Sequence, residues 1–196
     1  ASKVSILSSS NTRKNTKQVK SLPERAKGVY DGHQELDVVL TCLPNSSVVE
    51  NVYEEMLKNV LRKNTVWIDC TSGDPSVSES LAKSTKETHG SIFLDCAVSG
   101  GPAGARKGTL TTMMGGDEVS VERVRPVLET FASHINYLGP AGAGHAVKAM
   151  NNTLLAAHIC AASEALVGLK RFGVNPSDAL RAINTSSGRS WVTQQR

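Results

Sequence analysis

Lys148 and Asn152 are the pair of residues whose types and spacing most directly indicate chemistry. They stand four positions apart in the apolar stretch 145–171, so a helix there would carry both on one face. Burial among apolar side chains lowers the pKa of a lysine toward neutrality and suits it to proton transfer. The Asn152 amide would orient the same substrate group, with His145 as a neighbour. The alternative is a lysine that simply extends its charge into solvent.

The run Ser99-Gly100-Gly101 is the second candidate, in the small-residue loop 97–108. Paired glycines let the backbone approach a ligand and aim successive N–H groups at an anion, and Ser99 adds a hydroxyl donor. A substrate that bears a carboxylate needs such donors; a glycine turn without a ligand is the competing interpretation. Two more loops rich in small and hydroxyl residues, 43–47 and 70–75, follow other apolar runs.

These candidates need elements that hold them, and the first two thirds of the chain alternates strand and helix patterns. Apolar, β-branched runs predict strands at 3–7, 37–42, 65–69, 91–96, 109–114 and 134–138. Helical patterns occur at 12–22, 46–57, 75–88 and 119–131. This alternation predicts a parallel sheet with helices on both faces, and ligands bind beyond the carboxyl ends of such strands. The three loops are therefore expected to meet at one edge of the sheet.

The pattern changes near Gly139. One long apolar helix is predicted over 145–171, closed by Gly173, and a shorter one over 176–184. We therefore expect an α/β domain over 1–139 and the first part of an all-α domain over 140–196. The long stretch contains Lys148, Asn151, Asn152, His158 and Glu164, which favours a buried central helix over a membrane span.

Composition excludes several classes of protein. The chain has 196 residues, 39% of them hydrophobic, which is too apolar for a disordered chain. A net charge of +4 and an aromatic content of 4% give no support to nucleic-acid binding. We expect neither a nucleic-acid nor a membrane partner.

The cysteines and histidines do not indicate a metal site. Four cysteines form no CxxC pair, and the five histidines show no metal-ligand spacing with them. We interpret the cysteines as small buried apolar residues in a reducing, intracellular compartment, cytoplasmic or mitochondrial.

Four segments resemble the β-hydroxyacid dehydrogenase family along nearly the whole chain. DVVLTCLPNSSVVENVY (37–53) resembles the cofactor-side strand and loop of that family. DCAVSGGPAGARKGTLTTMMGG (95–116) resembles its substrate-binding signature, and GPAGAGHAVKAMNN (139–152) its catalytic signature. INTSSGRSW (183–191) is similar to the 3-hydroxyisobutyrate branch.

The resemblance implies a fold and an activity. It implies a Rossmann-like, mostly parallel sheet followed by the start of an all-α domain with a long central helix. The implied activity is NAD(P)-dependent oxidation of a small 3-hydroxy acid, similar to 3-hydroxyisobutyrate, to the semialdehyde. The alternatives are a reductase of aldehyde acids, a 6-phosphogluconate-type dehydrogenase, or a non-catalytic binding module. Self-association into a homo-oligomer is expected.

The resemblance also assigns roles to residues. Lys148 would be the general acid/base, and Asn152 would help to fix the substrate. Ser99, Gly100 and Gly101 would hold the carboxylate of the substrate. The residues implied to line the dinucleotide near the nicotinamide are Leu43, Pro44, Asn45 and Thr71.

The sequence departs from the family at its ends. It contains no GxGxxG turn, since the glycines of 139–144 follow the order GxxGxG, and the opening strand matches the second strand of the family. The segment 28–36 is short, and the later helices with a second lysine would follow Arg196. We therefore expect a central portion of a chain of roughly 300 residues, lacking the first strand and its glycine turn.

The choice between NAD and NADP depends on the end of the opening strand. An acid there binds the ribose of NAD, whereas hydroxyls and arginine suit the 2′-phosphate of NADP. Ser8, Ser9 and Arg13 occur there without an acid, which favours NADP. The resemblance to the hydroxyisobutyrate branch favours NAD, and a plain helix start with a solvated basic face is the third interpretation.

Overall fold

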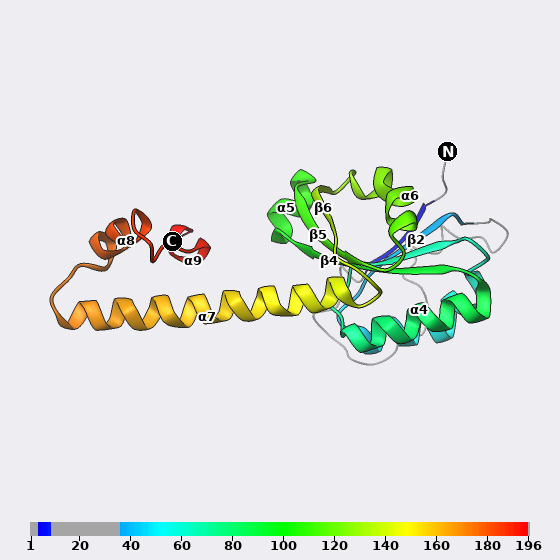
Figure 1. The fold of residues 1–196 in the computed structure, drawn as a ribbon, viewed down its shortest axis with the longest axis horizontal. Coiled ribbons are helices and arrows are strands. Elements are labelled where there is room, and N and C mark those ends of the chain that lie inside the picture. The colour runs from blue at the N-terminus through cyan, green and yellow to red at the C-terminus, as the bar shows by residue number, and fades with distance from the viewer. Residues whose placement is uncertain (1–3, 9–35, 196) are drawn as a thin grey trace. The chain divides into compact units, whose positions relative to one another are not determined.

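The computed structural model describes residues 4–8 and 36–195, and the chain divides into two compact units, Ala1–Lys148 and Ala149–Arg196 (Figure 1). The described residues of the first unit include a six-stranded sheet whose spatial order is the chain order, β1 to β6. Its strands are β1 (Val4–Ser8), β2 (Val38–Cys42), β3 (Val66–Asp69), β4 (Ile92–Ser99), β5 (Leu110–Gly115) and β6 (Ala132–Tyr137).

Among the described residues, helices lie between the strands from β2 onward and follow β6. The connecting helices are α2 (Ser46–Val52), η1 (Tyr53–Leu57), α3 (Lys58–Val60), α4 (Pro75–His89), α5 (Gly101–Lys107) and α6 (Glu118–Leu128). They are followed by α7 (Ala143–Arg171), α8 (Pro176–Asn184) and α9 (Trp191–Gln194). Helix α7 begins in the first unit and continues through the second.

The sheet is mostly parallel, as the sequence predicts, with one reversal. Strands β1 to β4 pair in parallel, β4 and β5 pair antiparallel, and β5 and β6 pair in parallel. The reversal has a simple cause, because a parallel crossover needs a dozen or more residues and the β4–β5 connection, residues 100–109, is shorter. The mostly parallel sheet that the sequence predicts is therefore confirmed, and the short connection places its one reversal, among the described strands, at β5.

Apolar side chains pack on both faces of the sheet. On one face Val49, Tyr53 and Leu81, from α2, η1 and α4, pack with Trp67 and Phe93. The other face is covered by α6, and Figure 1 shows α4 and α6 on opposite sides of the sheet. The α6 cluster consists of Val38, Leu40, Val66, Ile68, Cys70, Leu94, Cys96, Met114, Val121, Val124 and Leu128. Burial on both faces explains why these strands read as continuous apolar runs.

The predicted strands are confirmed to within three residues at each end, and so are the helices predicted at 46–57, 75–88, 119–131, 145–171 and 176–184. The first of these includes one π-helical turn, η1. The helix predicted at 12–22 lies outside the described residues. The loop predicted at 97–108 is wrong in part, because β4 continues to Ser99 and α5 follows. Proline in the first turn and a left-handed Gly108 at the end define α5 as a short helix.

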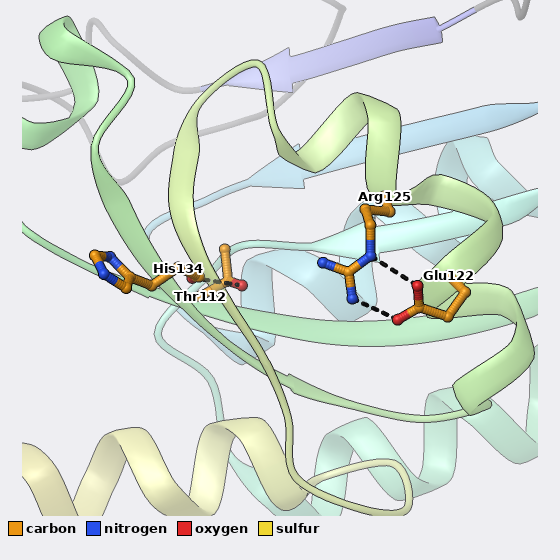
Figure 2. A network of polar contacts seen from close by, with 4 residues as sticks. All are labelled: Thr112, Glu122, Arg125 and His134. Atoms are coloured by element: carbon orange, nitrogen blue, oxygen red, sulfur yellow. Dashed lines mark hydrogen bonds and ion pairs between the residues drawn. The ribbon is translucent and has the colours of Figure 1, made fainter.

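Figure 2 shows two structural polar contacts, one between β5 and β6 and one within α6. The Thr112 hydroxyl donates to the backbone carbonyl of His134 over 3.4 Å, which ties β5 to β6. On the surface of α6, the Arg125 guanidinium donates two hydrogen bonds to the Glu122 carboxylate, one of them 2.7 Å long. This pairing lowers the pKa of Glu122 and supports one turn of the helix.

Two expectations about burial are corrected. Cys70 and Cys96 are buried, but Cys42 and Cys160 are exposed, the first because it ends β2 at the rim of the sheet. The long helix is not a buried central helix within the described residues, since only Gly144 and His145 of α7 are buried. By length and composition alone α7 could cross a membrane, but it also carries Lys148, Asn152 and Glu164.

Candidate active site

A buried hydrogen-bond network joins the carboxyl ends of β2 and β3. Asp69, the last residue of β3, accepts hydrogen bonds from the hydroxyls of Thr41 at 2.8 Å and Thr71 at 2.6 Å, and from the Thr71 N–H at 3.2 Å. The Thr71 hydroxyl in turn accepts the N–H of Leu43 at 3.0 Å. Asp69 thus fixes the loop that follows β2 to the loop that follows β3.

Burial and hydrogen bonds shift the pKa of the Asp69 carboxylate in opposite directions. Burial raises its pKa above the ordinary value, while the hydrogen bonds from Thr71 and Thr41 lower it. A buried carboxylate is tolerated only with such donors. The network therefore depends on both threonine hydroxyls.

A second buried acid, Asp95 of β4, holds the start of α7. One carboxylate oxygen accepts the N–H of Gly142 at 2.7 Å and the other accepts the N–H of His145 at 2.9 Å. The first turn of a helix leaves such N–H groups without partners, and a negative charge there is favourable. Asp95 is therefore a cap supplied by the sheet.

The His145 side chain fixes the same turn from another side. Its Nδ1 lies 2.7 Å from the hydroxyl oxygen of Ser78 on α4, and the residue is 1% exposed. A Cβ atom at Gly73 would come within 2.7 Å of the imidazole, so the loop after β3 is packed directly against it. The entry to α7 is thus closely packed against the loop after β3.

Lys148 lies in α7 three residues after His145 and is the last residue of the first unit. Its side chain is partly buried, and burial lowers its pKa from the ordinary value of 10.5. Asn152 follows on the same helix, is exposed, and belongs to the second unit. Its participation in a site with Lys148 stays a prediction.

Ser99, Gly100 and Gly101 lie where β4 ends and α5 begins. Gly100 has a φ of 124°, and a Cβ there would come within 3.0 Å of Leu110, whereas a Cβ at Gly101 would meet nothing within 4 Å. Both glycines are exposed and Ser99 is half-buried. The backbone of this junction is therefore open to an approaching anion.

The residues expected to hold a dinucleotide are only partly together in the described structure. Leu43, Pro44 and Asn45 form the loop after β2, and Leu43 is bonded to Thr71. The Thr71 hydroxyl is engaged by Asp69 and Leu43 and the residue is 1% exposed, so it supports the loop from beneath. The cofactor-choice residues fall largely outside the description. Ser8 ends β1, while Ser9 and Arg13 lie outside the described residues.

Sequence reasoning missed Asp69 and Asp95 as parts of the site. Each ends or interrupts an apolar run, VWID and IFLDCAV, that is otherwise typical of a fully buried strand. A charged residue is almost never fully buried without partners, so an acid inside such a run indicates a bound polar group nearby. That signal was present in the sequence, although the identity of the partners was not.

Two family models match the chain almost end to end. Residues 3–139 match the NAD binding domain of 6-phosphogluconate dehydrogenase. Residues 142–196 match the domain described as NAD-binding of NADP-dependent 3-hydroxyisobutyrate dehydrogenase. The chain belongs to the β-hydroxyacid dehydrogenase family. It therefore contains the NAD(P)-binding, Rossmann-like domain of that family.

Relatives of this β-hydroxyacid dehydrogenase chain include the mitochondrial 3-hydroxyisobutyrate dehydrogenase of Drosophila melanogaster, 38% identical over 86% of the chain and 54% of the relative. A probable 3-hydroxyisobutyrate dehydrogenase of Mycobacterium bovis is 40% identical over 81% of the chain and 53% of its own length. The solved structure of 3-hydroxyisobutyrate dehydrogenase from Mycobacterium tuberculosis with L-serine has a TM-score of 0.75 at 38% identity, over 80% of this chain and 53% of that one. The chain spans about half the length of these relatives.

Proposed function

We propose that the whole protein oxidises a small 3-hydroxy acid, 3-hydroxyisobutyrate or a near analogue, to the semialdehyde with NAD(P)⁺. The observation that carries the proposal is the place of Lys148, whose pKa is lowered. It follows His145 by three residues, and the His145 N–H donates to Asp95 on β4, the strand that ends at Ser99. Relatives at 38–40% identity that are named 3-hydroxyisobutyrate dehydrogenases support the substrate class.

In this proposal each residue has one task. When bound, the nicotinamide cofactor accepts the hydride from the carbinol carbon. The Lys148 amine takes the hydroxyl proton as the carbonyl forms, and in the reverse direction its ammonium returns it. Ser99 and the backbone N–H groups of Gly100 and Gly101 hold the substrate carboxylate, and Asn152 orients the substrate.

The loops after β2 and β3 fit the nicotinamide end of such a cofactor. Pro44 and Asn45 are exposed, and the residue before them is held by the buried Thr71 and Asp69. An exposed tip on a fixed base is what positions a planar ring reproducibly. Leu43, Pro44 and Asn45 would therefore hold this end, with Thr71 supporting their loop from beneath. The sequence contains no GxGxxG turn, so no residues are assigned to the pyrophosphate.

The test is a substrate panel on the full-length protein with NAD⁺ and NADP⁺, together with Lys148→Ala. We expect reduction of the cofactor by 3-hydroxy acids and a loss of turnover of roughly 10²- to 10⁴-fold in the variant, as for loss of a general base. Lys83→Ala, an exposed lysine on α4, is the matched control and should keep wild-type turnover. Normal turnover by Lys148→Ala would remove the lysine from the mechanism.

The other arms of the panel discriminate between the alternatives. Aldehyde-acid reduction without oxidation of any 3-hydroxy acid would indicate a reductase, and release of CO₂ from 6-phosphogluconate would indicate the decarboxylating enzyme. Cofactor binding without turnover of any substrate would support a non-catalytic module. For the cofactor itself we propose NADP, from the hydroxyls and arginine at Ser8, Ser9 and Arg13. A higher kcat/KM with NAD⁺ would contradict that preference.

A further inference from the structure

Asp95 is fully buried on β4, and it is the one residue that bonds directly to the first turn of α7 through both of its carboxylate oxygens among the described residues. We propose that Asp95 is a positioning residue that sets the place of the Lys148 amine relative to the proposed carboxylate-binding residues Ser99, Gly100 and Gly101. The proposal rests on the proposed function and adds a residue that touches neither substrate nor cofactor.

The hydrogen bonds fix the helix start in direction as well as position. The two bonds, 2.7 Å from Gly142 and 2.9 Å from His145, use separate oxygens of one rigid carboxylate. Two points of attachment prevent the first turn from rotating about either bond. Lys148 follows His145 by three residues in the same helix, so its backbone position is set by that turn.

Close packing removes the room in which the turn could slip. A Cβ at Gly144 would lie 2.2 Å from the carbonyl oxygen of Met113 on β5 and 2.8 Å from the Asp95 carboxylate. A Cβ at Gly115 would lie 2.5 Å from the other Asp95 oxygen. The carboxylate is thus enclosed between glycines of β5 and α7, where no longer side chain fits.

The same strand that carries Asp95 leads to the substrate loop. β4 continues from Asp95 to Ser99 without interruption, and its pairing with β5 holds that segment in register from Asp95 opposite Gly115 to Ser99 opposite Thr111. Asp95 therefore connects the proposed carboxylate-binding residues to the helix of the proposed base through one strand. A displacement of about 1 Å between a base and its substrate costs about 10²-fold in rate.

Asp95→Asn tests the proposal with little change in shape. The amide keeps one acceptor oxygen but turns an NH₂ group toward a backbone N–H, so one attachment of the helix is lost. In the full-length enzyme we expect kcat to fall about 10- to 100-fold. The KM for the cofactor should change less than about threefold, because the loops after β2 and β3 are held by Asp69 instead.

A double variant separates positioning from general loss of structure. If Asp95 acts through Lys148, then Asp95→Asn should add no more than about threefold to the rate loss of Lys148→Ala. Rate losses that multiply in the double variant would overturn the proposal, and so would a kcat of Asp95→Asn equal to that of the wild type. Normal turnover by Lys148→Ala would instead overturn the proposed function, so the two failures are distinguishable.

Two further variants guard against a folding defect. Ser78→Ala removes the hydroxyl that holds the His145 ring and leaves Asp95 intact; it should lower kcat about two- to tenfold with the same KM pattern. A kcat that falls in Asp95→Asn but not in Ser78→Ala would show that the carboxylate alone holds the turn and would still support the proposal. Asp117→Asn is the matched control, since Asp117 caps α6, which carries no proposed site residue, and it should leave kcat unchanged.

Discussion

Two buried aspartates divide the work of holding the site. Thr41, Asp69, Asp95 and Gly115 are register partners in neighbouring strands, so they form one row across the sheet. One oxygen of Asp69 accepts hydrogen bonds from the loops proposed to contact the cofactor. Both oxygens of Asp95 accept hydrogen bonds from the start of the helix proposed to carry the base. A substitution in this row should therefore affect either cofactor binding or the chemical step, but not both.

Thr71→Val is the test of the Asp69 side of that row. The variant keeps the shape but leaves the buried Asp69 and the Leu43 N–H each short of a partner, at a cost of about 1–3 kcal/mol. We expect the Kd of the cofactor to rise roughly tenfold, which corresponds to about 1.4 kcal/mol, with kcat at saturating cofactor little changed. Calorimetric titration and chemical denaturation measure the two quantities.

The control for this prediction is Thr85→Val. Thr85 is also fully buried, but its hydroxyl donates only to the Ala82 carbonyl of its own helix α4. Its replacement should leave cofactor affinity at the wild-type value. Equal affinities of the Thr71 and Thr85 variants would show that the loop does not need the Asp69 network.

The pH dependence of oxidation should report Lys148. The amine must be neutral to accept the hydroxyl proton, so kcat/KM for oxidation should rise with pH and level off above the pKa of Lys148 in the folded protein. Because burial lowers that pKa, the rise should lie below 10.5. Carbonyl reduction needs the ammonium and should fall over the same range.

Measurements of kcat/KM from about pH 6 to about pH 10, for both oxidation and reduction, would determine the pKa of Lys148. Lys148→Arg should lose the titration, because a guanidinium stays protonated throughout this range. If Lys148→Arg kept the same rise of kcat/KM with pH, the titrating group would be another residue.

At the scale of elements, the junction of β4 and α5 depends on one glycine. Gly100 has a φ of 124° and lies against Leu110, so Gly100→Ala introduces both backbone strain and a contact of 3.0 Å. We expect the free energy of unfolding to fall by about 1–3 kcal/mol. Gly168→Ala, in the interior of α7 with nothing within 4 Å, should instead gain up to about 1 kcal/mol. Urea denaturation compares the two; equal stabilities would contradict the strain at Gly100.

Elements with strong local signals were predictable and those decided by tertiary contacts were not. Helix α4 was predictable because it has strong local start signals, with Asp74 as its N-cap and Pro75 in its first turn. The reversal of β5 was not predictable, because it depends on the length of the β4–β5 connection. The sequence predicted a longer loop there, over 97–108. Lys148 and Ser99 could be proposed as site residues from their local patterns, whereas Asp95 could not be assigned its partner, since its bonds reach about 50 residues along the chain.

For the whole molecule, the two units differ in what they bury. In the part of the first unit that the structure describes, an apolar cluster lies on each face of the sheet. In the second, α8 and α9 contact each other, with the Asn184 amide donating to the Thr193 carbonyl at 2.8 Å. On α7, Met150, Leu154 and Val167 remain 59–61% exposed. An exposed apolar helix of this length favours association with another apolar surface.

The 196-residue chain alone should therefore self-associate through α7. Leu154→Glu with Val167→Glu places charges on two sides of this exposed helix and should shift the chain toward the monomer at a given concentration. Val119→Glu is the matched control, because Val119 is the one exposed large apolar residue of α6, 78% exposed, and its replacement should leave association unchanged. Sedimentation equilibrium over a hundredfold range, from about 1 μM to about 100 μM, would follow the change. A wild-type chain that stays monomeric throughout would contradict a role for α7 in assembly. Equal association of the α7 variant and wild type would place the contact elsewhere.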